Sequence, residues 1–370
     1  MLIIPYKLTG RQMKLPMLPP IVDQSAQSST RRLYLSPGTQ ANWSVAAAIE
    51  NAMPRARLAN IASGLWNSAW TLLVLCNLLW ASNIVVGRVL LMHMPAVALS
   101  FWRWVGAFAV AFWFSWPYLK QDWRALLSHW KLMLVLAATG IAAFNTTAYI
   151  GLAGSTALNV LLLQSCLPLL VIVWAFVLFR EQASIWQLLG VAISLVGVAV
   201  VASHGSMPAL LALSFRHADL WIFASVVIYG VYAVLLRKRP AVHPLSFMLV
   251  AMGLGALMIA PLYGWELSTG ARIGDDWRNY AGILYMAVFP SFISYLFFNR
   301  AVQLIGAARA GQSTHLIPIF GCFMAVLLLG ESIHPYYITA VVLIAAGILL
   351  AQLKARPRIG AVRPVPSTPE

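Results

Sequence analysis

The chain has 370 residues, of which 61% are hydrophobic and only 9% are charged. This composition is too apolar for a soluble globular protein and predicts a protein of the lipid bilayer. The formal net charge of +15 would suggest nucleic-acid binding in a soluble protein, but most Lys and Arg residues lie between or beyond apolar runs. That distribution is typical of cytoplasmic loops, so we expect a membrane partner and no nucleic acid.

The sequence lacks the motifs of common catalytic and metal sites. It has no HExxH, no G-x-S-x-G and no Gly-rich phosphate loop ending in GK[ST]. Its three cysteines, Cys76, Cys166 and Cys322, lie inside apolar runs without CxxC spacing, which disfavours a disulfide framework and a zinc site. We therefore expect no metal, no cofactor and no catalytic residue.

The two ends of the chain differ from the rest. Residues 1–60 are basic, contain Pro, Ser and Gln, and show no sustained periodicity, which predicts a disordered cytoplasmic tail. Met53 comes just before the first long apolar run, so residues 1–52 also fit an over-long start assignment. Residues 354–370 form a second cytoplasmic tail in this interpretation.

Between the tails, ten apolar runs follow one another, each near the ~20 residues that cross a ~30 Å hydrocarbon core as a helix. We expect an all-α polytopic fold, because backbone groups inside lipid must be bonded within their own segment unless a barrel closes. The expected spans are residues 68–87, 95–117, 132–152, 157–179, 184–202, 219–236, 245–265, 280–299, 308–329 and 336–353.

The positive charges predict the orientation of these spans. With the amino terminus inside the cell, fifteen Lys and Arg residues fall in inside segments and only four, Arg88, Arg216, Arg272 and Arg278, fall in outside loops. Because cytoplasmic loops carry the excess of Lys and Arg, both termini are expected in the cytoplasm of a cell that holds the protein in its inner membrane.

The chain repeats itself. At an offset of 150 residues, Pro168 matches Pro318, Glu181 matches Glu331 and Gly197 matches Gly347; upstream the offset is 149 and pairs Arg88 with Arg237 and Gly106 with Gly255. Ten spans then divide into two units of five, at residues 66–205 and 216–353. Since five is odd, the second unit enters the membrane from the opposite face, and inverted repeats are typical of secondary transporters. The alternative is a duplicated bundle that only holds partners together.

Each repeat carries a proline in the middle of its fourth span. Pro168 and Pro318 free the carbonyls of Gln164 and Thr314 from their helical partners, because proline has no N–H. Transporters place substrate at such broken helices, although a single kink is equally well a matter of packing. The polar substrate-binding candidates around the two breaks are Gln164, Ser165, Gln312, Ser313 and His315.

Other polar and aromatic side chains in the spans form matched sets. Asn145 and Tyr149 align with Tyr295 and Asn299, and each pair lies on one helical face because its members are four residues apart. Trp80 and Asn83 in the first span stand at the places of Tyr229 and Tyr232 in the sixth. We treat all eight as candidate substrate contacts, with helix–helix packing as the alternative role.

Charged and titratable groups inside the spans are few. Arg103 lies well inside a span, where an arginine near the helix centre costs ~2.5–3.5 kcal/mol, so it is a functional candidate by default. The alternative is that its side chain reaches the outer face or bonds backbone carbonyls. His315 is the only histidine in mid-span and could carry a coupling proton, bind substrate or bond another helix. No Asp or Glu lies deep in a span, and Glu181 and Glu331 are interpreted as anchors at helix ends.

These features resemble the EamA family of the drug/metabolite transporter superfamily. The resemblance rests on Tyr149–Leu152 and the segment to Ala157, on Leu167-Pro168 through Glu181, on Asn299-Arg300-Ala301, on Pro318 through Gly330-Glu331, and on Arg103 with the small residues that follow it. It covers residues 68–353 and implies a secondary carrier that exports small metabolites such as amino acids, their derivatives or toxic analogues. It also implies a central cavity lined by spans 1–4 and 6–9.

The sequence thus predicts an exporter of a small polar or zwitterionic solute with an apolar part, working by alternating access, with Arg103 as a group that could take a carboxylate. A membrane-embedded enzyme or a non-transporting assembly or sensor protein is the alternative. Proton coupling and a homodimer are left open.

Overall fold

A computed structural model describes residues 64–353 of the chain, apart from 182, 207, 209–215, 307–309 and 312. The predicted tails at residues 1–60 and 354–370 lie outside the described residues. Residues 69–353 belong to one compact unit, and this unit is described here.

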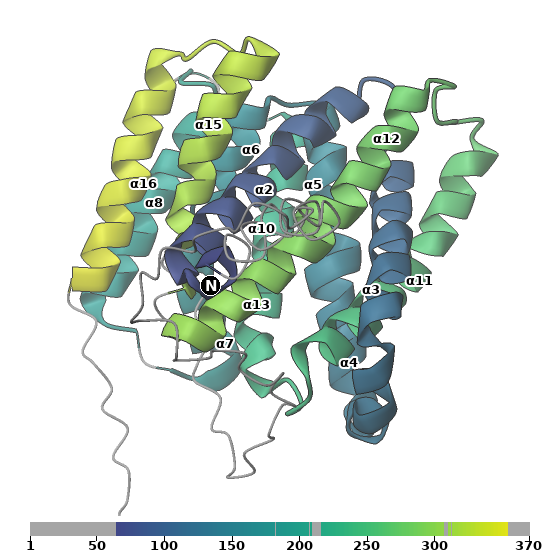
Figure 1. Cartoon of the computed structure of the whole chain (residues 1–370). Helices are drawn as coiled ribbons and strands as arrows, with labels where there is room; N and C mark the ends of the chain where they lie inside the picture. Colours follow the sequence, from purple (N-terminus) through teal and green to yellow (C-terminus); the bar gives the residue numbers. More distant parts are fainter. Residues whose placement is uncertain are drawn as a thin grey trace, which may run out of the picture. The chain divides into compact units, whose positions relative to one another are not determined.

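Within the described residues every regular element is helical (Figure 1). The first repeat contains α2 (Ala69–Leu90), α3 (Ala96–Ser128), α4 (Trp130–Ala137), η1 (Ala138–Ala142), α5 (Ala143–Ala153), α6 (Ala157–Gln164), α7 (Leu167–Phe179) and α8 (Ile185–Ala202). The second contains α10 (His217–Leu235), η2 (Leu236–Lys238), α11 (Pro244–Ser268), α12 (Trp277–Met286), η3 (Ala287–Ile293), α13 (Ser294–Ile305), η4 (Ser313–His315), α15 (Leu316–Leu329) and α16 (Pro335–Leu353).

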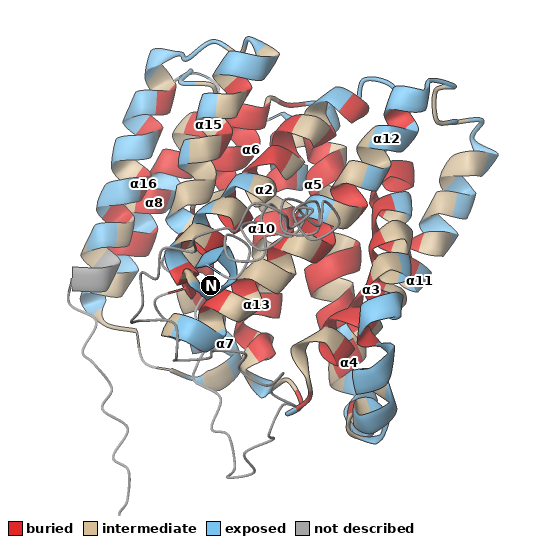
Figure 2. Ribbon diagram, in the orientation of Figure 1, coloured by how far each residue is buried: buried red, intermediate tan, exposed pale blue. Residues whose placement is uncertain are grey.

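The helices have the length and composition of a multi-pass membrane protein. Seven of them are long and apolar enough to cross a bilayer, and α6 with α7, bent by 41°, makes an eighth if the pair is one span. Ser313–Leu329 and Pro335–Leu350 are apolar but shorter. Large apolar side chains lie on the outside, with Trp113 82% exposed and Leu257 69% exposed, and buried residues face inward (Figure 2). Lipid is the environment that suits such a surface.

The two repeats share their irregular turns. A π-helical segment interrupts the third expected span at η1 and the eighth at η3, and the two segments begin 149 residues apart. The fourth span breaks at Ser165 and Cys166, just before Pro168, and the ninth has the 3₁₀ turn η4 just before Pro318. The missing N–H of each proline accounts for a break at this place in both repeats.

Helices of one repeat pack mainly against helices of the other. The extensively packed pairs are α8 with α16, α3 with α11, α5 with α10, and α2 with α13 and α15. Small residues permit the approach of α8 to α16: a Cβ on Gly347 would lie 2.4 Å from the carbonyl oxygen of Gly190, and one on Gly197 would lie 2.8 Å from Ile344 Cγ1. The repeated glycines therefore mark one helix crossing that involves both repeats.

We name the two ends of the bundle after the broken span, as the α6 end and the α7 end. At the α6 end, the carboxylate of Glu331 accepts hydrogen bonds from the backbone N–H groups of Ala157 at 2.7 Å and Leu158 at 2.9 Å. At the α7 end, Glu181 follows the last turn of α7 and accepts a hydrogen bond from Arg237 at 2.9 Å. The two glutamates thus lie at opposite ends of one span.

Candidate functional site

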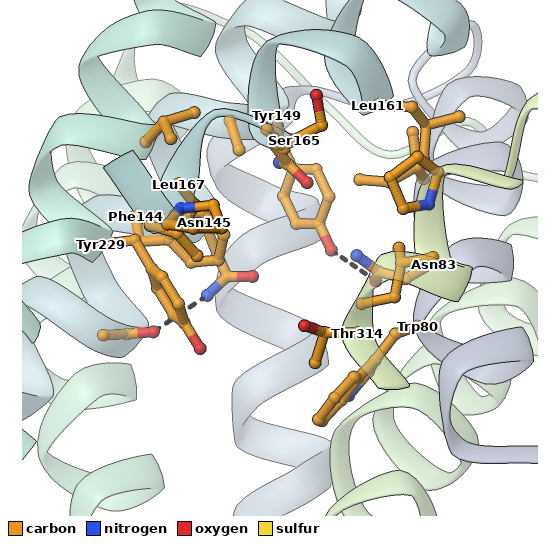
Figure 3. Close-up of a pocket in the computed structure, with 18 of the residues that line it drawn as sticks. Trp80, Asn83, Phe144, Asn145, Tyr149, Leu161, Ser165, Leu167, Tyr229 and Thr314 are labelled. Carbon is orange, nitrogen blue, oxygen red and sulfur yellow. Dashed lines mark hydrogen bonds between the residues drawn. The ribbon is translucent and has the colours of Figure 1, made fainter. Parts of the chain in front are cut away.

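A cavity of about 200 Å³ lies in the middle of the bundle, between the two broken spans. Side chains from both repeats converge on it, among them Trp80 and Asn83 of α2, Tyr149 of α5, Tyr229 of α10 and Thr314 of η4 (Figure 3). The predicted binding residues that line it are Trp80, Asn83, Arg103, Asn145, Tyr149, Gln164, Ser165, Tyr229, Tyr295 and His315, together with both prolines, Pro168 and Pro318.

Arg103 is held inside the protein by side chains. It is only 4% exposed. Its Nε donates to Ser291 Oγ at 2.7 Å and its Nη1 donates to Asn145 Oδ1 at 2.9 Å and to the Tyr149 hydroxyl. The guanidinium also lies 4.7 Å from the centroid of the Trp104 ring. Arg103 therefore does not extend to the membrane surface, and its head lies in the wall of the cavity.

The charge of Arg103 has no anionic partner in the described part of the chain. The contacts between acidic and basic side chains found there are Arg237 with Glu181 and His204 with Asp219, and neither involves Arg103. All the hydrogen bonds of Arg103 come from Nε and Nη1, so Nη2 remains available as a donor. A buried cation with spare donors is the group that would bind a planar carboxylate.

The rest of the wall is amide and aromatic. The Tyr149 hydroxyl donates to Asn83 Oδ1 at 3.0 Å, as the dashed line in Figure 3 shows. Phe144 and Tyr229 have ring centroids 4.4 Å apart, and Trp80 meets Tyr295 edge to face at 5.6 Å. Such walls bind apolar and aromatic groups, while the amides orient polar ones.

The two helix breaks contribute the remaining polar groups. Ser165 Oγ donates to the carbonyl of Leu162 at 2.6 Å, and Thr314 Oγ1 donates to that of Gly311 at 2.8 Å. His315 lines the cavity, and its ring makes no hydrogen bond to the described residues.

Comparison with known proteins identifies the family of this chain. The model of the EamA-like transporter family matches residues 67–203 and again residues 216–353. The chain belongs to this family. The resemblance drawn from the repeated motifs is confirmed, and the chain is a multi-pass membrane protein of a transporter family.

Several proteins that are similar to this chain carry the names of transporters. "Uncharacterized transporter YyaM" of Bacillus subtilis is 27% identical over 59% of this chain and 72% of its own. "Probable amino-acid metabolite efflux pump" of Salmonella typhimurium is 26% identical over 75% of this chain and 93% of its own. "Probable terminal-alkyne amino-acid exporter" of Streptantibioticus cattleyicolor is 25% identical over 59% of this chain and 72% of its own.

A solved crystal structure has the same fold at low sequence identity. It covers 78% of this chain and 99% of its own with a TM-score of 0.52 and 18% identity. This similarity concerns the fold alone.

Three predicted binding residues of this EamA-like chain lie away from the described wall of the central cavity. Tyr232 and Asn299 line a second cavity of about 40 Å³. Ser313 is buried and accepts a hydrogen bond from Asn77 Nδ2 at 2.9 Å, which ties α2 to η4. Gln312 lies outside the described residues.

One buried acid escaped the sequence analysis of this chain. Asp219 lies in the first turn of α10, and its side chain is fully buried. It accepts hydrogen bonds from Ser155 Oγ at 2.7 Å and from Asn159 Nδ2 at 3.3 Å, and its other oxygen lies 3.2 Å from Nε2 of His204. Asp219 stands at the beginning of its span, where Ser155 of the α5–α6 turn contacts it.

Proposed function

We propose that the chain is a secondary transporter that exports a small organic metabolite carrying a carboxylate and an apolar part. Its ten spans form two inverted repeats of five, which expose the central cavity to one side of the inner membrane and then to the other, with both termini in the cytoplasm. The seven long spans, the bent pair and the two shorter apolar helices support this count of ten. The opposite placement of Glu181 and Glu331 supports the inversion.

We infer the substrate class from the buried guanidinium of Arg103. A buried guanidinium without an acid beside it is costly, and an anionic solute would provide the missing partner. Exporters among the relatives are named for amino-acid compounds, which carry a carboxylate. No acidic residue in the described part of the chain lines the cavity, so the ammonium group of an amino acid would meet aromatic faces, hydroxyls, amides and carbonyls there. The carboxylate is therefore the group that the site recognises most strongly.

Transport by purified protein in proteoliposomes tests this function. A panel of labelled aromatic and aliphatic amino acids is loaded, efflux is measured, and unlabelled compounds then compete: the free acid, its N-acetyl derivative and its carboxamide. We expect the acid and the N-acetyl derivative to compete and the carboxamide to compete roughly tenfold less, because it lacks the charge-assisted hydrogen bonds to Arg103.

Two variants assign the effect to Arg103. Arg103→Gln should abolish the preference for the acid over the carboxamide, whereas Arg103→Lys should keep part of it because the charge remains. Arg278→Gln alters an exposed arginine in the first turn of α12 and is the matched control. If Arg103→Gln keeps the preference for the acid over the carboxamide, Arg103 is not the group that recognises the carboxylate. If the parent protein transports no solute of the panel, the chain is not an exporter of these metabolites.

A further inference from the structure

Arg88 joins α2 to α5 at the α6 end of the bundle. Its Nη1 donates to the backbone carbonyl of Leu152 at 3.0 Å and to that of Ala153 at 2.9 Å, in the last turn of α5. The last carbonyls of a helix lack partners within it, and a cation is favoured beside them. The Leu152 carbonyl also accepts a hydrogen bond from the Ser155 N–H at 3.4 Å. Gly87, one residue before Arg88, faces α5 as well, and a Cβ there would be in ordinary contact with Leu152 Cδ2 at 3.4 Å. This contact lies one helical turn beyond Ile84 and Ala148, which line the central cavity.

The second repeat has the same arginine without the same contact. Arg237 corresponds to Arg88 at the offset of 149, and Val302 and Gln303, at the end of α13, correspond to Leu152 and Ala153 at the offset of 150. Arg237 makes its ion pair with Glu181 instead, at 2.9 Å. Its Nε is buried and has no hydrogen-bond partner. Only some of the hydrogen-bond donors of the Arg237 guanidinium therefore have a partner among the described residues.

A second cavity lies near this end of the bundle. It is lined largely by α11, between Pro244 and Met252, together with Leu236 at the end of α10 and with Phe298 and Asn299 of α13. Trp104 and Tyr295 belong to its wall and to the wall of the central cavity. Helices α2 and α5 pack together at the α6 end, whereas α10 and α13, both fully described, are not a packed pair. The two ends of the bundle thus differ where the sequence repeats.

We propose that Arg88 and Arg237 are paired positioning residues of the transport cycle, each sealing one end of the cavity in turn. In the state seen here Arg88 seals the α6 end. In the opposite state Arg237 leaves Glu181 and donates to the carbonyls of Val302 and Gln303, which closes the second cavity, while Arg88 releases α5. This inference rests on the proposed alternation of the two repeats.

Cysteine labelling measures which end is sealed without any solute. Thr314→Cys, in the wall of the central cavity, is the reporter, in a chain whose native cysteines are replaced by alanine (C76A, C166A, C322A). An impermeant maleimide is applied to right-side-out and to inverted membrane vesicles, and the ratio of the two labelling rates is recorded. The side that holds each end is assigned separately with exposed Ser332→Cys at the α6 end and exposed Lys238→Cys at the α7 end.

The two arginine variants should move this ratio in opposite directions. Arg88→Gln favours labelling from the α6 side by roughly tenfold, the factor expected when a two-state equilibrium loses a hydrogen bond from a charged group. Arg237→Gln favours labelling from the α7 side. Arg88→Lys keeps the charge and takes an intermediate ratio, and Arg278→Gln leaves the ratio unchanged.

A shift in the same direction for both variants, or no shift, overturns the proposal. A merely structural role would lower protein yield and thermal stability without opposite shifts, so both are measured alongside. Because labelling needs no solute, its result is independent of whether Arg103 binds a carboxylate. The failure of that function and the failure of the paired arginines are therefore distinguishable.

Discussion

At the scale of single residues, the absence of a Cβ at Gly255 determines how closely α11 approaches η1, the π-helical segment of the first repeat. A Cβ on Gly255 would lie 2.2 Å from Ile141 Cγ2 and 2.8 Å from Ile141 Cβ. Its counterpart Gly106 faces the other π-helical segment, where a Cβ would lie 2.8 Å from Ala287 Cβ. Both repeats thus use a glycine to seat a helix against the irregular turn of the other repeat.

Gly255→Ala should therefore destabilise the protein by about 1–3 kcal/mol, the usual cost of overpacking a tight contact. Gly264→Ala, in the same helix, meets nothing within 4 Å and should be neutral or stabilising by up to ~1 kcal/mol, since alanine favours helix. Thermal unfolding in detergent compares the two. Ile141→Ala should restore part of the stability lost in Gly255→Ala, and equal melting temperatures for both glycine variants would contradict the contact.

The candidate site shows what a sequence can say about single residues. Arg103 stands out in a sequence because a charge inside a span is costly, and it does line the cavity. Tyr229 and Tyr232 could not be separated, because residues three apart lie on nearly the same face of a helix. Tyr229 lines the central cavity, while the Tyr232 ring lies against Gly140, where a Cβ would be 2.3 Å from Cδ2 of the ring. Asp219 was overlooked because its carboxylate is buried by a turn from another part of the chain, and such burial produces no periodic pattern in the sequence around Asp219.

At the scale of elements, the start of α11 depends on a neutral histidine. His243 Nδ1 accepts a hydrogen bond from the Leu245 N–H at 3.3 Å, and its ring stacks on Tyr118 at a centroid distance of 3.8 Å. The Asp122 carboxylate accepts a hydrogen bond from the His243 backbone N–H at 2.9 Å. Burial lowers the pKa of His243, against an opposing effect of Asp122. The folded protein therefore favours the uncharged ring.

Stability should consequently fall as the medium is acidified. A histidine whose pKa is lower in the folded than in the unfolded protein contributes stability above its unfolded pKa, and loses it as the pH falls through the folded pKa. Melting temperatures followed by tryptophan fluorescence between pH 7.5 and pH 5.5 should fall more in the parent than in His243→Asn, which keeps a capping side chain but does not titrate. Parallel curves for the two proteins would show that His243 is not responsible.

Helix boundaries were the weaker part of the element predictions. The expected second span ends at residue 117, where Pro117 and polar residues begin, yet α3 continues to Ser128. In the same way α13 continues to Ile305, beyond the expected end at residue 299. Hydropathy marks where a helix leaves lipid, whereas the helix ends where its backbone bonding ends. The breaks before Pro168 and Pro318 were predictable because proline acts on the backbone directly.

At the scale of the whole molecule, inverted repeats require Glu181 and Glu331 to face opposite compartments. Single cysteines at Lys238, beside Arg237, and at Ser332, beside Glu331, report this, since both positions are exposed. An impermeant thiol reagent should modify Ser332→Cys in intact cells and Lys238→Cys only in inverted vesicles, if both termini are cytoplasmic. Modification of both from one side would contradict the inversion, and a swapped result would reverse the orientation alone.

The carboxylate caps at the α6 end also bear on how the protein is made. Glu331 caps the beginning of α6, and Glu266, at the end of α11, caps the beginning of α3 by accepting from Val97 at 3.1 Å and Ala98 at 2.7 Å. Both acids are synthesised more than a hundred residues after the amides they satisfy. Without the second repeat, these backbone N–H groups of α3 and α6 lack the carboxylates that accept their hydrogen bonds in the folded protein. The first repeat is therefore completed by the second, and we expect it to fold less stably when it is made alone.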